Sequence, residues 1–336
     1  MKKVLALILI SLFFIGSSAF CITMDDPIRN AAMPRGLGMG MAFVAVADDS
    51  SSPIFNPAGL VSLKNPEMSW MNYSRTFNMF NYVVANGAYP TEYGTFGLGG
   101  VFSNMSNVTV TVPTTREASY ADNLTLITYS SNLRRFVNLG SITRRIYIGM
   151  NLKLFQKNYS GSPAYTASGM NIDLGLKYTP NSRLSLGINK QNILGGTLDW
   201  NTGAKEYYPS PLVIGAAYRP DGKKQTYALD IEMPNDGALP ALMHMGTEYE
   251  MDENLVLRGG FDQLIDADAS TFWGLTLGLG LNVGGGFVMD YAYHPYYNNS
   301  EDVSNFISIS YVGEEQKKVK GEIKAFQPSD DMINYD

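Results

Sequence analysis

Three glycines at alternate positions, Gly36, Gly38 and Gly40, are the first residues of the chain whose spacing could serve chemistry. A G-x-G-x-G pattern can hold a phosphate when it follows a strand, opens a helix and has an acidic residue about 20 positions further on. No strand pattern precedes these glycines, and no acidic residue stands in that context, so we expect no nucleotide site. Glycines at this spacing instead favour a backbone that lies close to another surface or takes a positive φ.

Histidines are the next candidates for chemistry, and the chain has two, His244 and His294. A hydrolase would need a serine or aspartate beside one of them, and the sequence contains no G-x-S-x-G, H-E-x-x-H or Cys–His pairing. We therefore expect satisfied structural histidines and keep a membrane-embedded lipid hydrolase as a remote alternative. The sequence predicts no enzyme, no cofactor and no metal.

The elements that would position such residues are short strands. From Glu67 to Val312, apolar residues alternate with glycine or polar residues, as in the segment from Met170 to Tyr178. The lengths cluster near the nine to eleven residues with which a tilted strand crosses a bilayer. We expect fourteen strands, at 67–75, 79–89, 94–103, 123–131, 145–156, 169–179, 183–190, 211–219, 225–232, 241–250, 254–262, 271–282, 286–294 and 304–312.

The connections between these segments alternate in length. Outer-membrane barrels have short turns on the inner side and longer loops on the outer side. Short turns are expected at Pro90–Tyr93, Thr179–Ser182, Met251–Glu253 and Asn282–Gly285, and loops at Asn104–Asn123, Gln191–Ser210, Gln263–Ser270 and His294–Asn305. Two connections break the rule, because 76–78 is short and 131–144 is long.

A soluble β-sandwich is the alternative fold, since its strands also alternate. Its water-facing side would carry many charged residues, whereas only 17% of this chain is charged and the polar faces are rich in glycine. Such a face suits a crowded lumen better. We therefore predict an all-β fold, a transmembrane antiparallel β-barrel of about 14 strands with an N-terminal hatch (plug) in its lumen.

The first residues predict export. Lys2 and Lys3 precede an apolar run at 4–15 and small residues at 16–19, which is the pattern of a secretory signal peptide cleaved after Ala19 or Cys21. Lipidation of Cys21 is disfavoured by the bulky Phe20 before it. Cys21 is the only cysteine, which excludes disulfides, and no basic run suggests nucleic acid. We expect Sec-type export to the outer membrane and contact with its lipid bilayer.

Four parts of the chain follow from these patterns. Residues 1–21 are the predicted signal peptide, 22–64 the hatch, 65–313 the barrel and 314–336 a polar periplasmic tail. The Lys- and Glu-rich stretch Glu314–Phe326 is predicted to be a short helix, and the rest of the tail to be disordered.

The stretch from Gly36 to Leu60 resembles the N-terminal signature of the FadL-like outer-membrane proteins, especially their PorV/PorQ branch. The likeness is carried by Ala45-Val-Ala47-Asp48-Asp49 and by Asn56-Pro57-Ala58. It implies a fourteen-stranded barrel closed by an N-terminal hatch, which carries long-chain fatty acids or other hydrophobic small molecules. The PorV-like alternative is a barrel that serves protein secretion and surface attachment, with exported proteins as partners. The polar tail and the short mature chain depart from the fatty-acid transporters.

The hatch motif consists of Asn56, Pro57, Ala58 and Gly59. Pro57 disfavours a helical Asn56, so a helix that begins at the Ser50–Ser52 cap should stop there. The Asn56 amide can then fix the chain to the wall, while Ala58 and Gly59 keep the turn thin.

Two further sets of candidate residues complete the predicted site. The hatch glycines are Gly36, Gly38 and Gly40. Charged residues also gather on the predicted lumen face, and we single out Glu248, Arg258 and Asp290 as a candidate charge network, because adjacent antiparallel strands would bring Glu248 and Arg258 within reach of each other. An ion-pair network that braces the wall or the plug is favoured over a substrate path.

Overall fold

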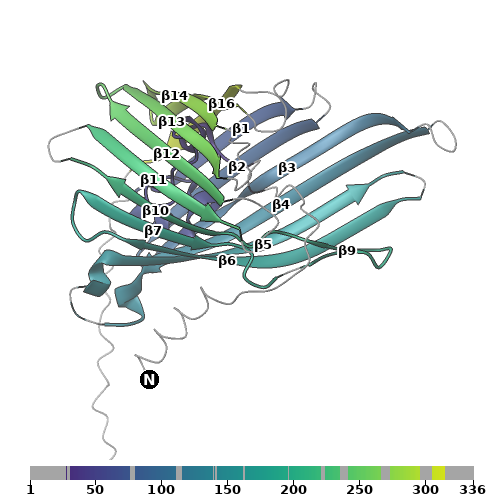
Figure 1. Cartoon of the computed structure of the whole chain (residues 1–336), viewed down its shortest axis with the longest axis horizontal. Coiled ribbons are helices and arrows are strands. Elements are labelled where there is room, and N and C mark those ends of the chain that lie inside the picture. Colours follow the sequence, from purple (N-terminus) through teal and green to yellow (C-terminus); the bar gives the residue numbers. More distant parts are fainter. Residues whose placement is uncertain are drawn as a thin grey trace, which may run out of the picture.

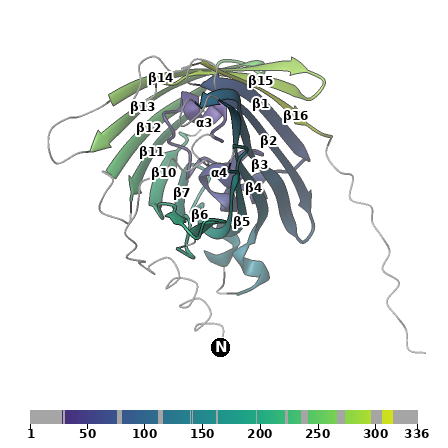
Figure 2. The same ribbon diagram turned by 90° about the vertical axis from the view of Figure 1, so that its right-hand side faces the viewer.

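The computed structural model describes residues 28, 31–75, 80–110, 116–138, 140, 142–161, 163–195, 197–220, 224–234, 241–265, 273–295 and 305–314. These residues form one antiparallel sheet that closes on itself into a barrel (Figures 1 and 2). The fourteen wall strands are β1 (Glu67–Arg75), β2 (Phe80–Thr91), β3 (Gly94–Val110), β4 (Arg116–Asn132), β5 (Ile146–Tyr159), β6 (Tyr165–Tyr178), β7 (Leu184–Lys190), β10 (Leu212–Tyr218), β11 (Gln225–Met233), β12 (Ala241–Glu250), β13 (Leu255–Ile265), β14 (Trp273–Gly284), β15 (Phe287–Tyr293) and β16 (Asn305–Val312).

Each wall strand pairs with the next along the barrel, and β1 pairs with β16 to close it, with Glu67 opposite Val312. The closed antiparallel barrel of fourteen strands predicted from the alternating pattern is therefore confirmed. The end of the barrel that carries the β2–β3, β6–β7, β12–β13 and β14–β15 turns is called the turn end below. The opposite end is called the loop end.

Two predicted loops at the loop end contain strands. The stretch predicted as the loop Asn104–Asn123 lies largely within β3 and β4, where Asn104 pairs with Ala121 and Val110 with Arg116. Its Ser, Asn and Thr residues resemble a loop in composition, but the backbone hydrogen bonds of a hairpin need no apolar face. The predicted loop Gln191–Ser210 holds a small hairpin of β8 (Thr197–Trp200) and β9 (Lys205–Tyr207), which pairs with β6 through β8.

Of the two connections that broke the length rule, 76–78 lies outside the described residues. The long one at 131–144 lies at the turn end and contains two short 3₁₀ helices, η2 (Leu133–Arg135) and η3 (Ile142–Arg145).

The outward face of the wall is apolar. Leu275, Leu277 and Ile307 are 59%, 62% and 56% exposed, and Tyr293 and Tyr311 near strand ends are 40% and 42% exposed. In water this arrangement would be unfavourable, whereas a lipid-facing barrel presents such a band. Within the described residues, no helix has both the length and the apolar character needed to cross a membrane.

Ile28 and residues 31–64, the lumenal segment, run inside this barrel (Figure 2). The segment contains α3 (Pro34–Gly38), α4 (Ser52–Phe55) and η1 (Pro57–Ser62). The helix α3 contacts β13, β14 and β15, while η1 contacts strands β3 to β6 on another part of the wall. A segment that touches separate parts of a closed wall fills its interior.

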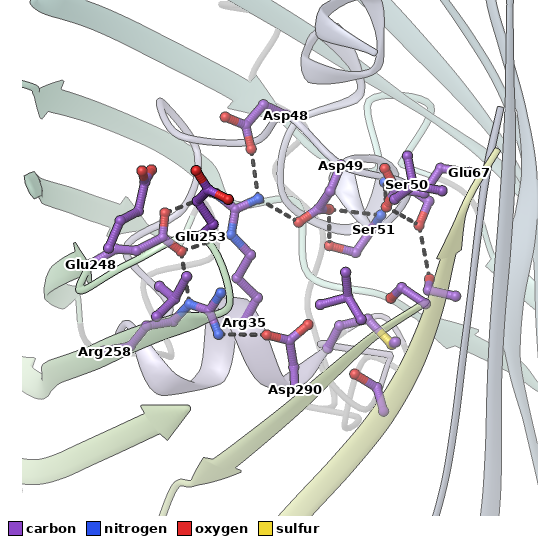
Figure 3. Close-up of a pocket in the computed structure, with 18 of the residues that line it drawn as sticks. Arg35, Asp48, Asp49, Ser50, Ser51, Glu67, Glu248, Glu253, Arg258 and Asp290 are labelled. Carbon is purple, nitrogen blue, oxygen red and sulfur yellow. Dashed lines mark hydrogen bonds and ion pairs between the residues drawn. The ribbon is translucent and has the colours of Figure 1, made fainter. Parts of the chain in front are cut away.

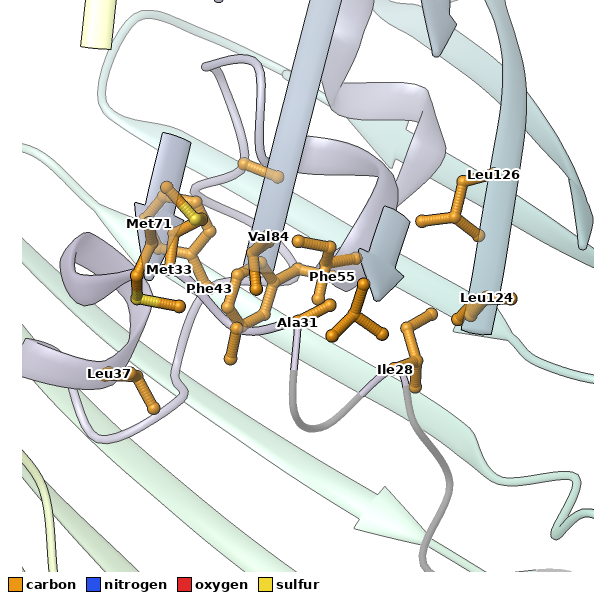
Figure 4. Close-up of a cluster of buried hydrophobic side chains, with 14 of the residues drawn as sticks. Ile28, Ala31, Met33, Leu37, Phe43, Phe55, Met71, Val84, Leu124 and Leu126 are labelled. Atoms are coloured by element: carbon orange, nitrogen blue, oxygen red, sulfur yellow. The ribbon is translucent and has the colours of Figure 1, made fainter. Parts of the chain in front are cut away.

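The hydrophobic core therefore sits in the lumen (Figure 4). Phe43 and Phe55 of the lumenal segment pack with their ring centroids 4.9 Å apart. Wall side chains such as Val84 and Leu124 join the same buried cluster. The predicted signal peptide and residues 315–336 of the predicted tail, including most of the predicted helix Glu314–Phe326, lie outside the described residues.

Candidate functional site in the barrel lumen

Asn56 ends α4 and ties the lumenal segment to the wall. Its backbone is extended, with φ −157° and ψ 107°, as the following Pro57 requires. The buried Asn56 Nδ2 donates to Val44 O at 2.9 Å and to Leu176 O of β6 at 3.1 Å, and Oδ1 accepts from Ala58 N at 3.1 Å. One amide thus joins two parts of the lumenal segment and one wall strand.

The residues after Pro57 sit where larger side chains would not fit. Ala58 is fully buried, and its carbonyl accepts a hydrogen bond from Ser130 Oγ of β4 at 3.1 Å. A Cβ on Gly59 would lie 2.4 Å from Ala47 O, well inside van der Waals contact. The thin turn expected from the sequence is therefore packed between the wall and the preceding loop.

The three alternating glycines each meet a different neighbour. A Cβ on Gly36 would lie 2.3 Å from the Phe55 ring, and one on Gly38 would lie 2.8 Å from Gly278 Cα of β14. Gly40 has φ +59°, and its Cβ would lie 2.6 Å from Phe261 N of β13. Of the two roles expected for these glycines, close approach to the wall is found at Gly38 and Gly40, and a positive φ is found at Gly40 alone.

The serine cluster before α4 does not cap the helix as predicted. The helix begins at Ser52, but its N-cap residue Ser51 makes no capping hydrogen bond with its side chain. Ser50 N and Oγ instead donate to Glu67 Oε1 of β1, at 3.0 and 2.9 Å. The Ser51 hydroxyl itself donates to Asp49 Oδ1 at 2.5 Å and does not cap the helix, while Ser50 joins the lumenal segment to β1.

Wall side chains also satisfy the backbone of the lumenal segment. Asp230 of β11 accepts from Phe43 N at 2.7 Å and from Val44 N at 2.8 Å through Oδ2. Buried backbone groups need such partners. Five other wall side chains donate to carbonyls of the segment: Asn151 to Pro53 O, Lys177 to Val46 O and Ala47 O, Ser185 to Ala45 O, Asn189 to Phe55 O, and Thr276 to Gly38 O.

Sequence reasoning expected polar and charged side chains on the lumen face, but it assigned none of these contacts to the residues that make them, namely Asp230, Lys177, Ser185, Asn189 and Thr276. Their signal was available in the pattern. Each is a polar residue at an inward position of a strand whose neighbouring inward positions are often glycine.

Arg35 lies at the centre of a charge network at the turn end (Figure 3). Its Nη1 contacts Asp48 Oδ1 at 2.7 Å and Asp49 Oδ2 at 2.9 Å, both within the lumenal segment. Its Nε and Nη2 donate to the two oxygens of Glu248 on β12, at 2.9 and 3.0 Å. The guanidinium is therefore a bidentate clamp between this segment and the wall.

The three residues singled out as a charge network do contact one another. Arg258 Nε lies 2.7 Å from Glu248 Oε2, and Arg258 Nη1 lies 2.6 Å from Asp290 Oδ1. Glu248 and Arg258 face each other directly across β12 and β13. Arg35 joins this network and was not predicted, although an arginine in the same segment as Asp48-Asp49 was a usable signal.

The charges of this segment depend on one another. Burial alone would raise the pKa of the Asp48 carboxyl, but the nearby cations Arg35, Lys177 and Arg219 outweigh it and hold that pKa well below its usual range. Burial opposes the charged form of Arg35 too, yet Asp48, Glu248 and Asp49 raise its pKa well above the ordinary value. Both groups are therefore charged at neutral pH.

A cavity of about 380 Å³ opens beside this network (Figure 3). It lies between the lumenal segment and β15, β16 and β1, and the β12–β13 turn also lines it. This volume falls within the range of about 300–1,000 Å³ typical of small-molecule sites.

The two histidines converge on one carboxylate in the wall. His244 Nδ1 lies 2.7 Å from Asp262 Oδ1, and His294 Nε2 lies 3.6 Å from Asp262 Oδ2. Both rings are buried. Among the residues that the structure describes, no group of three or more His, Cys, Asp or Glu side chains is arranged to hold a metal ion.

Comparisons with known proteins reveal the class of fold. No family model and no curated protein matches this sequence. The toluene transporter TbuX of Ralstonia pickettii matches the structure at 12% identity with a TM-score of 0.58, over 84% of this chain and 98% of that one. The monoaromatic hydrocarbon channel CymD matches at 14% identity with a TM-score of 0.57, over 84% and 97% of the two chains.

A FadL homologue of Pseudomonas aeruginosa is similar as well, at 10% identity and a TM-score of 0.53, over 83% of this chain and 98% of that one. The chain is thus a closed fourteen-stranded β-barrel with the FadL-like fold. At these identities the likeness concerns the fold, and the narrower PorV/PorQ assignment stays a prediction.

Proposed function

We propose that this protein is an outer-membrane channel for hydrophobic compounds and that the lumenal segment is its hatch. The apolar outer face of the wall suits a lipid bilayer. Among solved structures with this fold are transporters of toluene and a channel for monoaromatic hydrocarbons. Signal-peptide cleavage and the four-part division of the chain belong to the same proposal.

The apolar cluster inside the barrel is the observation that carries this proposal. Ile28, Phe43 and Phe55 meet Val84 and Leu124 in the lumen (Figure 4). Barrels that conduct water and ions have polar interiors, whereas an apolar interior offers favourable transfer to an apolar guest. The chain's own side chains fill this place, so a compound can enter only if the lumenal segment shifts.

Asn56 is the residue whose release would allow that shift. Its amide Nδ2 donates to the carbonyls of Val44 and Leu176, and these acceptors would be left unpaired in a buried site if the amide were removed. Breaking these two hydrogen bonds would free the turn at Pro57 from β6 while the wall stays closed.

Uptake of a labelled monoaromatic hydrocarbon tests the proposal. Cells making the protein should take up the label faster than cells with an empty vector. Asn56→Ala should change the rate severalfold, because the hatch is released from β6. Asn254→Ala, at an exposed turn position, is the matched control and should leave the rate unchanged. If cells with and without the protein take up the label equally, the transport function is wrong.

A role in protein secretion and surface attachment is the second candidate. The feature that favours it is the β3–β4 hairpin, whose strands have 17 residues each and extend well past their neighbours (Figure 1). Such a hairpin can offer a protein-binding surface at the loop end. Pull-down of exported proteins that depends on residues 104–110 and 116–123 would support this role, and an empty pull-down would exclude it.

A further inference from the structure

We propose that the cavity at the turn end is a charge filter, which passes neutral or cationic hydrophobic compounds and rejects anionic ones such as ionised fatty acids. This inference rests on the proposed transport function and narrows its substrate class.

The first step concerns where a compound could leave the barrel. On several strands the wall and the lumenal segment touch backbone to backbone. A Cβ on Gly149 of β5 would lie 2.2 Å from Pro57 C, and one on Gly187 of β7 would lie 2.4 Å from Val44 O. On β12, a Cβ on Gly246 would lie 2.4 Å from Met39 O. At these three positions no compound fits between the two surfaces.

The sector formed by β15, β16 and β1 is different. There a cavity of about 380 Å³ lies beside the lumenal segment (Figure 3). Asp290, Ser308, Ser310 and Glu67 line it from the wall, and Ser50 of the lumenal segment contacts Glu67. The wall around the cavity is closed, because β14–β15, β15–β16 and β16–β1 are all hydrogen-bonded pairs. A compound that leaves the lumen towards the turn end beside β15, β16 and β1 would pass through this cavity.

The second step concerns the charge of that route. Of the nineteen residues that line the cavity, eight are Asp or Glu and two are Arg. Glu250, Asp252 and Glu253 form its rim at the end of β12 and in the following turn, where all three are exposed.

Both arginines already hold carboxylates of the network. Arg35 uses Nε, Nη1 and Nη2 on Glu248, Asp48 and Asp49. Arg258 uses Nε and Nη1 on Glu248 and Asp290. A carboxylate guest would have to displace one of these acceptors, and the displaced acceptor would then itself lie unpaired in the cavity.

The physical consequence follows from Coulomb's law. Clefts lined by one sign of charge focus the field, because their low-dielectric walls screen it poorly. An ionised fatty acid would meet like charges at close range, a neutral hydrocarbon would meet no such barrier, and an ammonium would be attracted. Such fields change entry rates by about 10- to 1,000-fold, so we expect at least about tenfold discrimination.

Three probes with the same ten-carbon chain test the filter in cells making the full-length protein. The probes are labelled decanol, decylammonium and decanoate at pH 7, and cells with an empty vector give the background. We expect protein-dependent uptake of decanol and decylammonium, and at least about tenfold slower uptake of decanoate. The triple variant Glu250→Gln/Asp252→Asn/Glu253→Gln should reduce this difference severalfold. Glu92→Gln, in the β2–β3 turn and outside the cavity lining, should not.

Added salt is a second measurement, because it screens exposed charges and should also reduce the difference in the wild type. Protein-dependent uptake of decanoate as fast as that of decanol would overturn the filter and leave the transport function standing. A difference that persists unchanged in the triple variant would overturn it too. If none of the three probes enters faster than background, both the transport function and the filter that rests on it are wrong.

Discussion

Arg35 is the single residue on which most of the charge balance in the lumen depends. It contacts three carboxylates, of which two belong to its own segment and one, Glu248, lies 213 residues away on the wall. Removing one partner from a largely buried ion-pair network leaves uncompensated charge behind. The contribution of Arg35 should therefore be visible both in stability and in the anchoring of the lumenal segment.

Arg35→Gln should lower the free energy of unfolding by an amount towards the lower end of the roughly 3–5 kcal/mol found when buried pairs are broken, because 19% of its side chain is exposed. Urea unfolding of the vesicle-inserted protein would measure this change. Arg144→Gln, an exposed position in η3, is the control. Equal losses in the two variants would contradict the role assigned to Arg35.

The pKa of Asp48 leads to a prediction about how the stability of the protein depends on pH. Its pKa in the folded protein lies below the usual value of about 3.9, because the nearby cations outweigh burial. Its stabilising contribution is thus fully present above the unfolded-state pKa and is lost as the pH falls through the folded-state pKa. As the pH falls from about 5 to about 2, we expect a shallower loss of stability in Asp48→Asn than in the wild type. If the free energy of unfolding falls equally steeply with pH in the variant and in the wild type, this prediction is wrong.

At the scale of elements, glycines decide how closely the lumenal segment packs on the wall strands. Gly149 of β5 leaves room for the Pro57 backbone, and Gly175 of β6 leaves room for the Asn56 side chain, whose Oδ1 would lie 2.2 Å from a Cβ there. Alanine has only one carbon more, but backbone atoms of a closed barrel cannot move aside easily. The fit between the two elements therefore depends on the missing methyl groups.

Gly149→Ala should loosen the lumenal segment without opening the wall. We expect faster proteolysis within residues 31–64 and a cost of about 1–3 kcal/mol, as for overpacked cores. Gly87→Ala on β2 is a matched control, because its Cβ would meet nothing closer than 3.8 Å. If proteolysis is unchanged in Gly149→Ala, or equally fast in both variants, the close packing is not what holds the segment.

At the scale of the whole molecule, the apolar outer face determines where the barrel can exist. Leu277 lies in the middle of β14 and is 62% exposed, whereas Val283 lies near the turn end of the same strand and is 57% exposed. In water both would be equally unfavourable. In a bilayer their depths differ, so their responses to charge should differ as well.

Leu277→Arg should reduce insertion into lipid vesicles by about 2–4 kcal/mol, and Val283→Arg by about 0–1 kcal/mol, since the cost falls from the bilayer midplane to the interface. The inserted fraction after urea titration measures both. Equal effects at the two depths would contradict a barrel that spans a bilayer. This comparison needs no knowledge of the substrate.

The sequence by itself determined the strands and their number. Alternation with a period of two is a local property, so each segment signals a half-apolar strand without knowledge of its partners. The end of α4 at Asn56 is local too, because Pro57 restricts the residue before it. That Glu248 faces Arg258 is also local information, because one short turn joins the two strands that carry them. Composition is a local property too, and it predicted a loop at residues 104–123. The structure instead continues the pairing of β3 with β4 through these polar residues.

Only the tertiary structure decided which residues meet inside the barrel. The contact of Arg35 with Glu248, the hydrogen bonds from Asp230 to Phe43 and Val44, and the acid-lined cavity join segments about 200 residues apart or on different strands. Such contacts depend on how the sheet closes and on the depth at which the lumenal segment lies within it. No local pattern encodes these, because the same alternating strands would close equally well around another interior.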